Sequence, residues 1–263
     1  MCELLHRLKP KQRRGSKPRC HSLAHGTPED VSARLTSLIK PWGSVNPSDH
    51  WMPDGFDHAE EARLDIAPQL IPAELDRAAL RSWWLTVPEN ANTPNWDIAS
   101  TCMVGNCRGL LLVEAKAHER ELRSAEAGKP LRAPVTFNSR RNHARIGWCI
   151  EDASLARSEQ TKLNWTMSRD SRYQMANRFS WSWKLTELKF PVILVYLGFV
   201  NAKEMIDRGA PLTDESWPRM VRSHSATLFP GEVWDREWTV NGRSFVPLIK
   251  AMEQPLCCAP EAP

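Results

Sequence analysis

Three residues near the middle of the chain, Asp97, Glu114 and Lys116, are two acids and an amine whose spacing could bring them together in one reactive site. Asp97 and Glu114 lie on two apolar segments separated by Gly105 and Asn106, a residue pair typical of a tight β-hairpin turn. If these two residues form the turn, Asp97 lies opposite Glu114, and side chains that face each other across a hairpin are about 5 Å apart. Strand alternation puts Lys116 on the same face. The sequence therefore predicts two carboxylates and an amine on one patch.

Two carboxylates at this separation repel each other when no cation is present. A cation bound between them would remove this repulsion. Such oxygen ligands hold a hard divalent cation such as Mg²⁺, which keeps several waters and also binds substrate phosphate. The cation polarises a phosphoryl oxygen and lowers the pKa of a bound water. Lys116 would orient that water or offset charge on the phosphate. We therefore expect Asp97 and Glu114 to hold Mg²⁺, with Mn²⁺ as a substitute.

The elements that must position these residues are predicted from periodicity and turn signals. The first hairpin is expected over 95–104 and 108–116, and a second over 233–240 and 243–249. The run 191–200 is apolar throughout, which fits a strand buried on both faces of a parallel or mixed sheet. Helices are predicted over 27–40, 57–64, 71–87, 117–127, 140–157 and 171–188. The expected fold class is α/β.

Asp97 followed by Glu114-Ala115-Lys116 at the end of an apolar strand resembles the PD-(D/E)xK nuclease superfamily. The stretches LLVEAKAHEREL and YQMANRF, the latter followed by PVILVYLGFV, are similar to a group of uncharacterised bacterial proteins assigned to that fold. The likeness runs from about Trp51 to Ile249. It implies a restriction-endonuclease-like mixed β-sheet flanked by helices and a metal-dependent attack on DNA phosphodiesters.

The resemblance also implies roles for individual residues. Asp97 and Glu114 become metal ligands, the backbone carbonyl of Ala115 becomes a third, and Lys116 becomes the catalytic amine. Catalytic turnover is not implied for every member of such a fold. A nuclease-fold binding module without activity, and a nuclease that processes RNA, therefore stay open beside the favoured DNA enzyme. A homodimer is open as well, because enzymes of this fold that cut both strands often work in pairs.

Further candidates surround the central residues. Glu121 lies on the helix directly after Lys116 and would add a metal ligand, although glutamates in such helices commonly face solvent. Gln174 shares a helix face with Asn177 and Arg178. Superfamily members often place a polar residue from this helix beside the site, so Gln174 either orients the lysine or the water, or belongs to an ordinary amphipathic helix.

One further acid, Glu74, precedes the hairpin and has two interpretations. It is either an additional ligand in superfamily fashion or, as we prefer, a favourable charge near a helix start.

The distribution of charge bounds the domain organisation. Of the net charge of +4, the first 20 residues supply seven basic side chains against one acid, whereas the rest of the chain holds 28 bases and 30 acids. We expect residues 1–26 to be a disordered basic tail, which either contacts phosphates, solubilises the chain or acts as a targeting peptide. Residues 27–254 would form a single nuclease-like domain with helical N-terminal decoration, and residues 255–263 a loose end.

Composition also limits the cellular setting. The longest nearly uncharged apolar run, 190–200, is shorter than the roughly 20 residues that a bilayer-spanning helix needs, so we expect no membrane association. Seven scattered cysteines, an odd number, with no apolar signal segment before them favour a reducing cytoplasm. Cys102 and Cys107 are predicted to lie on the hairpin face opposite the carboxylates, as small core residues.

Overall fold

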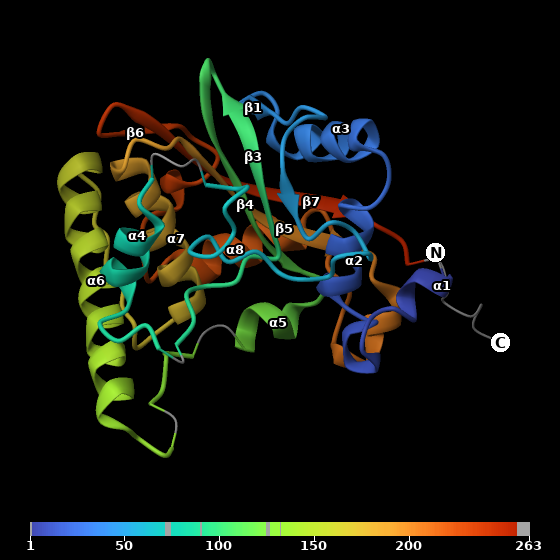
Figure 1. Ribbon diagram of the computed structural model, residues 1–263. Coiled ribbons are helices and arrows are strands. Elements are labelled where there is room, and N and C mark those ends of the chain that lie inside the picture. Colours follow the sequence, from blue (N-terminus) through green and yellow to red (C-terminus); the bar gives the residue numbers. More distant parts are fainter. Residues whose placement is uncertain (1, 72–74, 90, 125–126, 132, 257–263) are drawn as a thin grey trace.

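The computed structural model describes residues 2–71, 75–89, 91–124, 127–131 and 133–256. Within them a seven-stranded mixed sheet has the order β1-β3-β4-β5-β7-β6, and β2 also pairs with β3 (Figure 1). Its long strands are β3 (Ile98–Val104), β4 (Cys107–Lys116), β5 (Val192–Val200) and β7 (Arg243–Glu253). Its short strands are β1 (Gly43–Ser44), β2 (Trp51–Met52) and β6 (Trp238–Val240). The expected α/β class with a mixed sheet flanked by helices is confirmed.

Helices cover both faces of this sheet (Figure 1). One face packs against α2 (Ser16–Leu23) and α3 (Pro28–Ile39), which follow α1 (Cys2–Leu5). The other face packs against α4 (Arg77–Trp84), α6 (Phe137–Thr161), α7 (Tyr173–Glu187) and α8 (Ser216–Ser225). The short α5 (Glu119–Ser124) follows β4, and the 3₁₀ turns are η1 (Pro10–Gln12), η2 (Lys203–Arg208) and η3 (Gly231–Val233). No helix in the described ranges combines the length and apolarity needed to cross a bilayer.

Strand β5 lies in the middle of the sheet and explains why the sequence 191–200 is apolar at every position. It pairs in parallel with both β4 and β7, and every residue of the strand is buried. Ile193 and Val195 face the α2–α3 layer, whereas Leu194 and Tyr196 face the α6–α7 layer. A strand covered on both faces cannot place polar side chains on either one, so the predicted doubly buried strand is confirmed.

The first hairpin forms in the predicted register. Ile98 pairs with Val113 and Val104 with Cys107, so that Gly105 and Asn106 are the two turn residues. Gly105 has a φ of 56°, which a glycine adopts without the steric cost that a side chain would bring. Cys102 lies in the α2–α3 core layer, on the face opposite Glu114, as predicted. The second hairpin, β6 with β7, also forms, around Asn241 and Gly242.

The helix predictions are right in type for most segments and differ at the ends. Thr136 accepts a hydrogen bond from the N–H of Ser139 at 3.1 Å, and this cap starts α6 earlier than the apolar periodicity indicated. Asp76 caps α4 in the same way, so this helix begins at Arg77 rather than near residue 71. Glu74 lies outside the described residues, as do 257–263 of the expected C-terminal end.

The predicted helix over 57–64 is wrong. The backbone N–H of Ala62 donates to the carbonyl of Trp96, and the N–H of Trp96 donates back to Ala62 at 2.9 Å. Asp54 and His58 exchange a similar pair of backbone hydrogen bonds. These long-range and turn contacts use the backbone groups that a helix would need, and they fix this segment beside the start of β3.

The N-terminal segment also differs from the expected disordered tail. Basic side chains of this segment form ion pairs with acids in the body of the protein. Arg19 is buried and donates to both carboxylate oxygens of Glu204, at 2.5 and 2.8 Å. Lys17 pairs with Glu61 at 2.7 Å. Leu23 is fully buried in the α2–α3 core layer. Part of the basic charge therefore pairs with distant acids, and residues 16–23 belong to the folded domain.

Replacing Leu23 tests this order directly. We expect Leu23→Ala to lower the free energy of unfolding by about 2 to 4 kcal/mol, because it removes buried apolar volume from the core. Urea unfolding followed by tryptophan fluorescence measures the change. Lys11→Ala, at an exposed position of the same segment, serves as the control. Equal midpoints for the two variants would show that the segment is not packed as described.

Candidate functional site

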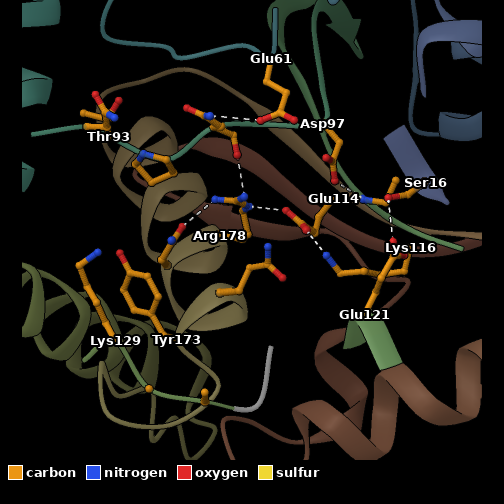
Figure 2. A pocket seen from close by; sticks show the side chains of 18 of the residues that line it. Ser16, Glu61, Thr93, Asp97, Glu114, Lys116, Glu121, Lys129, Tyr173 and Arg178 are labelled. Atoms are coloured by element: carbon orange, nitrogen blue, oxygen red, sulfur yellow. Dashed lines mark hydrogen bonds and ion pairs between the residues drawn. The ribbon is translucent and has the colours of Figure 1, made fainter. Parts of the chain in front are cut away.

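A pocket of about 860 Å³ lies at the open end of the β3–β4 hairpin, away from the Gly105-Asn106 turn (Figure 2). Its walls come from the start of α2, the loop before β3, the end of β4, α5 and the first two turns of α7. The predicted site residues within the described part of the chain all line it: Asp97, Glu114, Ala115, Lys116, Glu121 and Gln174. The fold thus brings together residues that are far apart in the sequence, since α5 and α6 lie between Asp97 and Gln174.

The carboxylate of Glu114 lies at the centre of the site, with 1% of its surface exposed. One oxygen accepts a hydrogen bond from the Lys116 ammonium, and the other accepts from Nε of Arg178 at 2.7 Å (Figure 2). Burial by itself would raise the pKa of Glu114, but the adjacent charges of Lys116 and Arg178 outweigh it and hold the pKa below its ordinary value. Glu114 is therefore ionised near neutral pH.

Arg178 is the functional candidate that the sequence analysis missed in this role. Its buried guanidinium also donates to the backbone carbonyl of Asn95 at 2.6 Å and to the side-chain oxygen of Asn177 at 3.0 Å, and it lies 4.7 Å from the centre of the Trp96 ring. These contacts tie α7 to the segment before β3. In the sequence, the one indication of this role was that Arg178 lies four residues after Gln174, on the same helix face. Its contact with Glu114 is seen only when α7 is packed against the sheet.

Asp97 lies just before β3 and is half-buried. Its Oδ2 accepts a hydrogen bond from the backbone N–H of Ala115 at 2.8 Å. Burial and the neighbouring charge of Glu114 raise the pKa of Asp97 to about 7. Since the N–H and C=O of one strand residue point to the same side, the carbonyl of Ala115 also faces Asp97 rather than β5. Two acids and a carbonyl are thus directed to one edge of the pocket.

Glu121 approaches the same edge from α5. Its Oε2 accepts a hydrogen bond from the backbone N–H of Ala117 at 2.6 Å, and its Oε1 lies 3.5 Å from Oγ of Ser16 at the start of α2. His118 lies 3.6 Å from the same carboxylate. Glu121 therefore joins the N-terminal segment to the pocket as well as lining it.

The opposite wall of the pocket is formed by α7 and the loop before α6. Gln174 lines the pocket from the first turn of α7. Beside it, the ammonium of Lys129 lies 4.8 Å from the centre of the Tyr173 ring (Figure 2). This wall therefore presents amide, aromatic and cationic groups to whatever occupies the pocket, and the orienting role expected for Gln174 stays a prediction.

The possible ligands for a divalent cation in this pocket are oxygen atoms. Among the described residues, no three or more His, Cys, Asp or Glu side chains gather closely enough to hold a metal ion by themselves. Mg²⁺, however, is usually bound through one or two carboxylates with waters and substrate phosphates, not through a cage made only of protein. The hard oxygen donors of Asp97, Glu114 and Ala115 fit that requirement.

Comparisons of the chain with protein-family models, with curated proteins and with solved structures gave no match.

Removing the Arg178 guanidinium should destabilise the fold. We expect Arg178→Met to lower the free energy of unfolding by about 3 to 5 kcal/mol, because the buried Glu114 carboxylate loses one of its two cationic partners. Arg178→Lys should cost less, since it keeps the charge but not the fork of donors. Urea unfolding gives the values, with Arg120→Met as an exposed control. An Arg178→Met midpoint equal to that of the control would contradict the proposed pairing.

Proposed function

We propose that this protein is a metal-dependent nuclease that hydrolyses DNA phosphodiester bonds on a restriction-endonuclease-like fold. One observation carries the proposal: the hairpin register brings Asp97, Glu114, Ala115 and Lys116 to the edge of a single open pocket. This is the arrangement that the resemblance to the PD-(D/E)xK superfamily implies, in a strand and helix context of the kind expected for it.

The ligands of the cation would be Asp97, Glu114 and the carbonyl of Ala115. When bound there, Mg²⁺ supplies charge that polarises the phosphoryl group and acidifies a bound water. The ionised Glu114 and the Asp97 carboxyl, which titrates near neutral pH, are the hard donors that such a cation prefers. A divalent cation beside Asp97 would favour its ionised form, because opposite charges stabilise each other.

Lys116 would act through its charge. Burial lowers the pKa of Lys116, but the carboxylates of Glu114 and Asp97 outweigh burial, so the net pKa lies above its ordinary value and the ammonium persists at neutral pH. A group that keeps its proton is unsuited to remove one from water. Lys116 would therefore hold the attacking water or offset the negative charge that develops on the phosphate. Its hydrogen bond to Glu114 would hold it beside the phosphate of a bound substrate.

The substrate class follows from the charges around the pocket. Lys116, Lys129 and Arg178 are the basic side chains of the described lining, and Glu61, Asp97, Glu114 and Glu121 are the acidic ones. A bound divalent ion would make the pocket net positive, which favours a polyanion. DNA remains our first choice because of the superfamily resemblance, and RNA is the alternative polymer that the same groups would accept.

One observation favours a second candidate, a binding module that keeps the fold without turnover. Both oxygens of Glu114 already accept hydrogen bonds from cationic side chains. A permanent pair of this kind neutralises Glu114 without any metal. In that case the pocket would bind phosphate groups through Lys116 and Arg178 alone.

Plasmid cleavage tests the enzyme. Purified protein with Mg²⁺ should convert supercoiled plasmid to nicked or linear forms, and EDTA should abolish the reaction. Asp97→Asn and Lys116→Met should each reduce the rate by at least about 100-fold, since they remove a ligand and the electrostatic group. The exposed Asp214→Asn and Lys40→Met serve as matched controls for charge loss. Equal cleavage by all of these proteins would show that the activity does not arise at this site.

Calorimetric titration with Mn²⁺ separates the enzyme from the binding module. The nuclease should give saturable heat that disappears in Asp97→Asn, whereas a site neutralised by Lys116 and Arg178 alone should give none. A folded wild-type protein that gives no heat of Mn²⁺ binding and no cleavage would support the binding module. Repeating the cleavage assay with single-stranded RNA in place of the plasmid tests the other substrate.

A further inference from the structure

The exposed apolar side chains of this protein are unevenly distributed. In the described part of the chain, five of the seven large apolar residues with high exposure lie on α6 or on the segment that leads into it: Leu131, Val135, Phe137, Trp148 and Leu155. Phe137 is 74% exposed, Trp148 52% and Leu155 68%. Exposed apolar side chains gathered on one element in this way indicate an interaction site. Figure 1 shows α6 along the outer edge of the molecule.

The spacing of these residues is that of a helix-pairing seam. Positions 137, 141, 144, 148, 151 and 155 follow one another in alternating steps of four and three, and all six are exposed. Residues on the other side of α6, Ile146, Cys149, Ile150 and Ala153 among them, are buried in the core of the domain. Alternating steps of four and three give the 3.5-residue repeat with which two helices pack side by side. Within the described residues, the outer face of α6 therefore has the repeat of a coiled-coil surface and is exposed at all six positions.

The charges on this seam indicate which helix fits it. Arg141 lies in the N-terminal half of the seam and Glu151 in the C-terminal half. If two copies of α6 cross antiparallel, Arg141 faces Glu151 of the partner subunit. In the same alignment Phe137 faces Leu155 of the partner subunit, and Ala144 faces Trp148 of the partner subunit. Apolar residues thus meet apolar residues, a small residue meets a large one, and opposite charges meet.

A parallel, in-register alignment keeps apolar contacts at Phe137 and Leu155 but loses the other two matches. It would place Arg141 against the partner's Arg141 and Glu151 against the partner's Glu151, and like charges at such positions oppose association. It would also place the bulky Trp148 against the partner's Trp148. The charges and side-chain sizes of the seam therefore favour the antiparallel arrangement, which a two-fold axis perpendicular to the helix generates.

We propose that the outer face of α6 is the interface of a homodimer, in which α6 pairs antiparallel with α6 of a second copy. The seam from 137 to 155 extends about 27 Å along the helix axis. Arg140 and Asp152 lie at matching levels beside it and would add a second charge pair at its rim. The inference does not depend on nuclease activity, since it uses no residue of the candidate pocket.

Sedimentation equilibrium of the full chain tests the dimer. Wild-type protein should show twice the 30.0 kDa chain mass at micromolar concentration. Trp148→Glu should show the mass of a single chain, because it places a charge in the centre of the seam. Ile206→Glu, which replaces a still more exposed apolar residue on η2, should leave the dimer intact. A wild-type protein that stays monomeric up to about 100 µM, or a dimer that Trp148→Glu does not dissociate, would overturn the proposal.

Charge reversal tests the partner and the orientation together. Arg141→Glu and Glu151→Arg should each be monomeric when alone, because each dimer would contain two like-charge contacts. Mixed in equal amounts, the two variants should form a heterodimer of doubled mass, in which both contacts pair opposite charges. Circular dichroism confirms that each variant is folded. A mixture that remains monomeric while wild type is dimeric would contradict the antiparallel α6 pairing and would indicate an interface elsewhere.

Discussion

The buried carboxylate of Glu114 is the constraint on which the rest of the site depends. An isolated charge at 1% exposure would be strongly destabilising, so the fold must supply compensating partners. Lys116 comes from the same strand, two residues further on, whereas Arg178 comes from α7. Because Arg178 also holds the carbonyl of Asn95, the same ion pair fixes the segment that carries Asp97. The ion pairs of one buried carboxylate thus hold β4, α7 and the start of β3 together.

This constraint explains how a helical N-terminal segment and a central hairpin share one pocket. The hairpin supplies the acids, and α5 supplies Glu121, whose carboxylate lies near Ser16 of α2. Arg19 of α2 is in turn paired with Glu204. The pocket is therefore formed where the hairpin, α2, α5 and α7 meet, while the apolar strand β5 holds the sheet beneath it in place.

Sequence patterns predicted those features that short-range rules control. The Gly105-Asn106 turn sets the hairpin register, and that register determines that Asp97 and Glu114 share an edge. Arg178 was missed in its role because its contact with Glu114 spans 64 residues and depends on how α7 packs. The order of the N-terminal segment was missed for the same reason, since Arg19 and Glu204 are 185 residues apart. The ends of α4 and α6 were set by capping side chains, which periodicity does not report.

We propose that Glu114 shares its charge between the two cationic side chains and a divalent ion held with Asp97. A crystal structure of the protein grown with Mn²⁺, with anomalous data collected for manganese, tests this arrangement. We expect one anomalous peak in contact with the carboxylates of Asp97 and Glu114 and the carbonyl of Ala115. A well-ordered pocket without a peak, in which Lys116 and Arg178 still occupy both oxygens of Glu114, would contradict it.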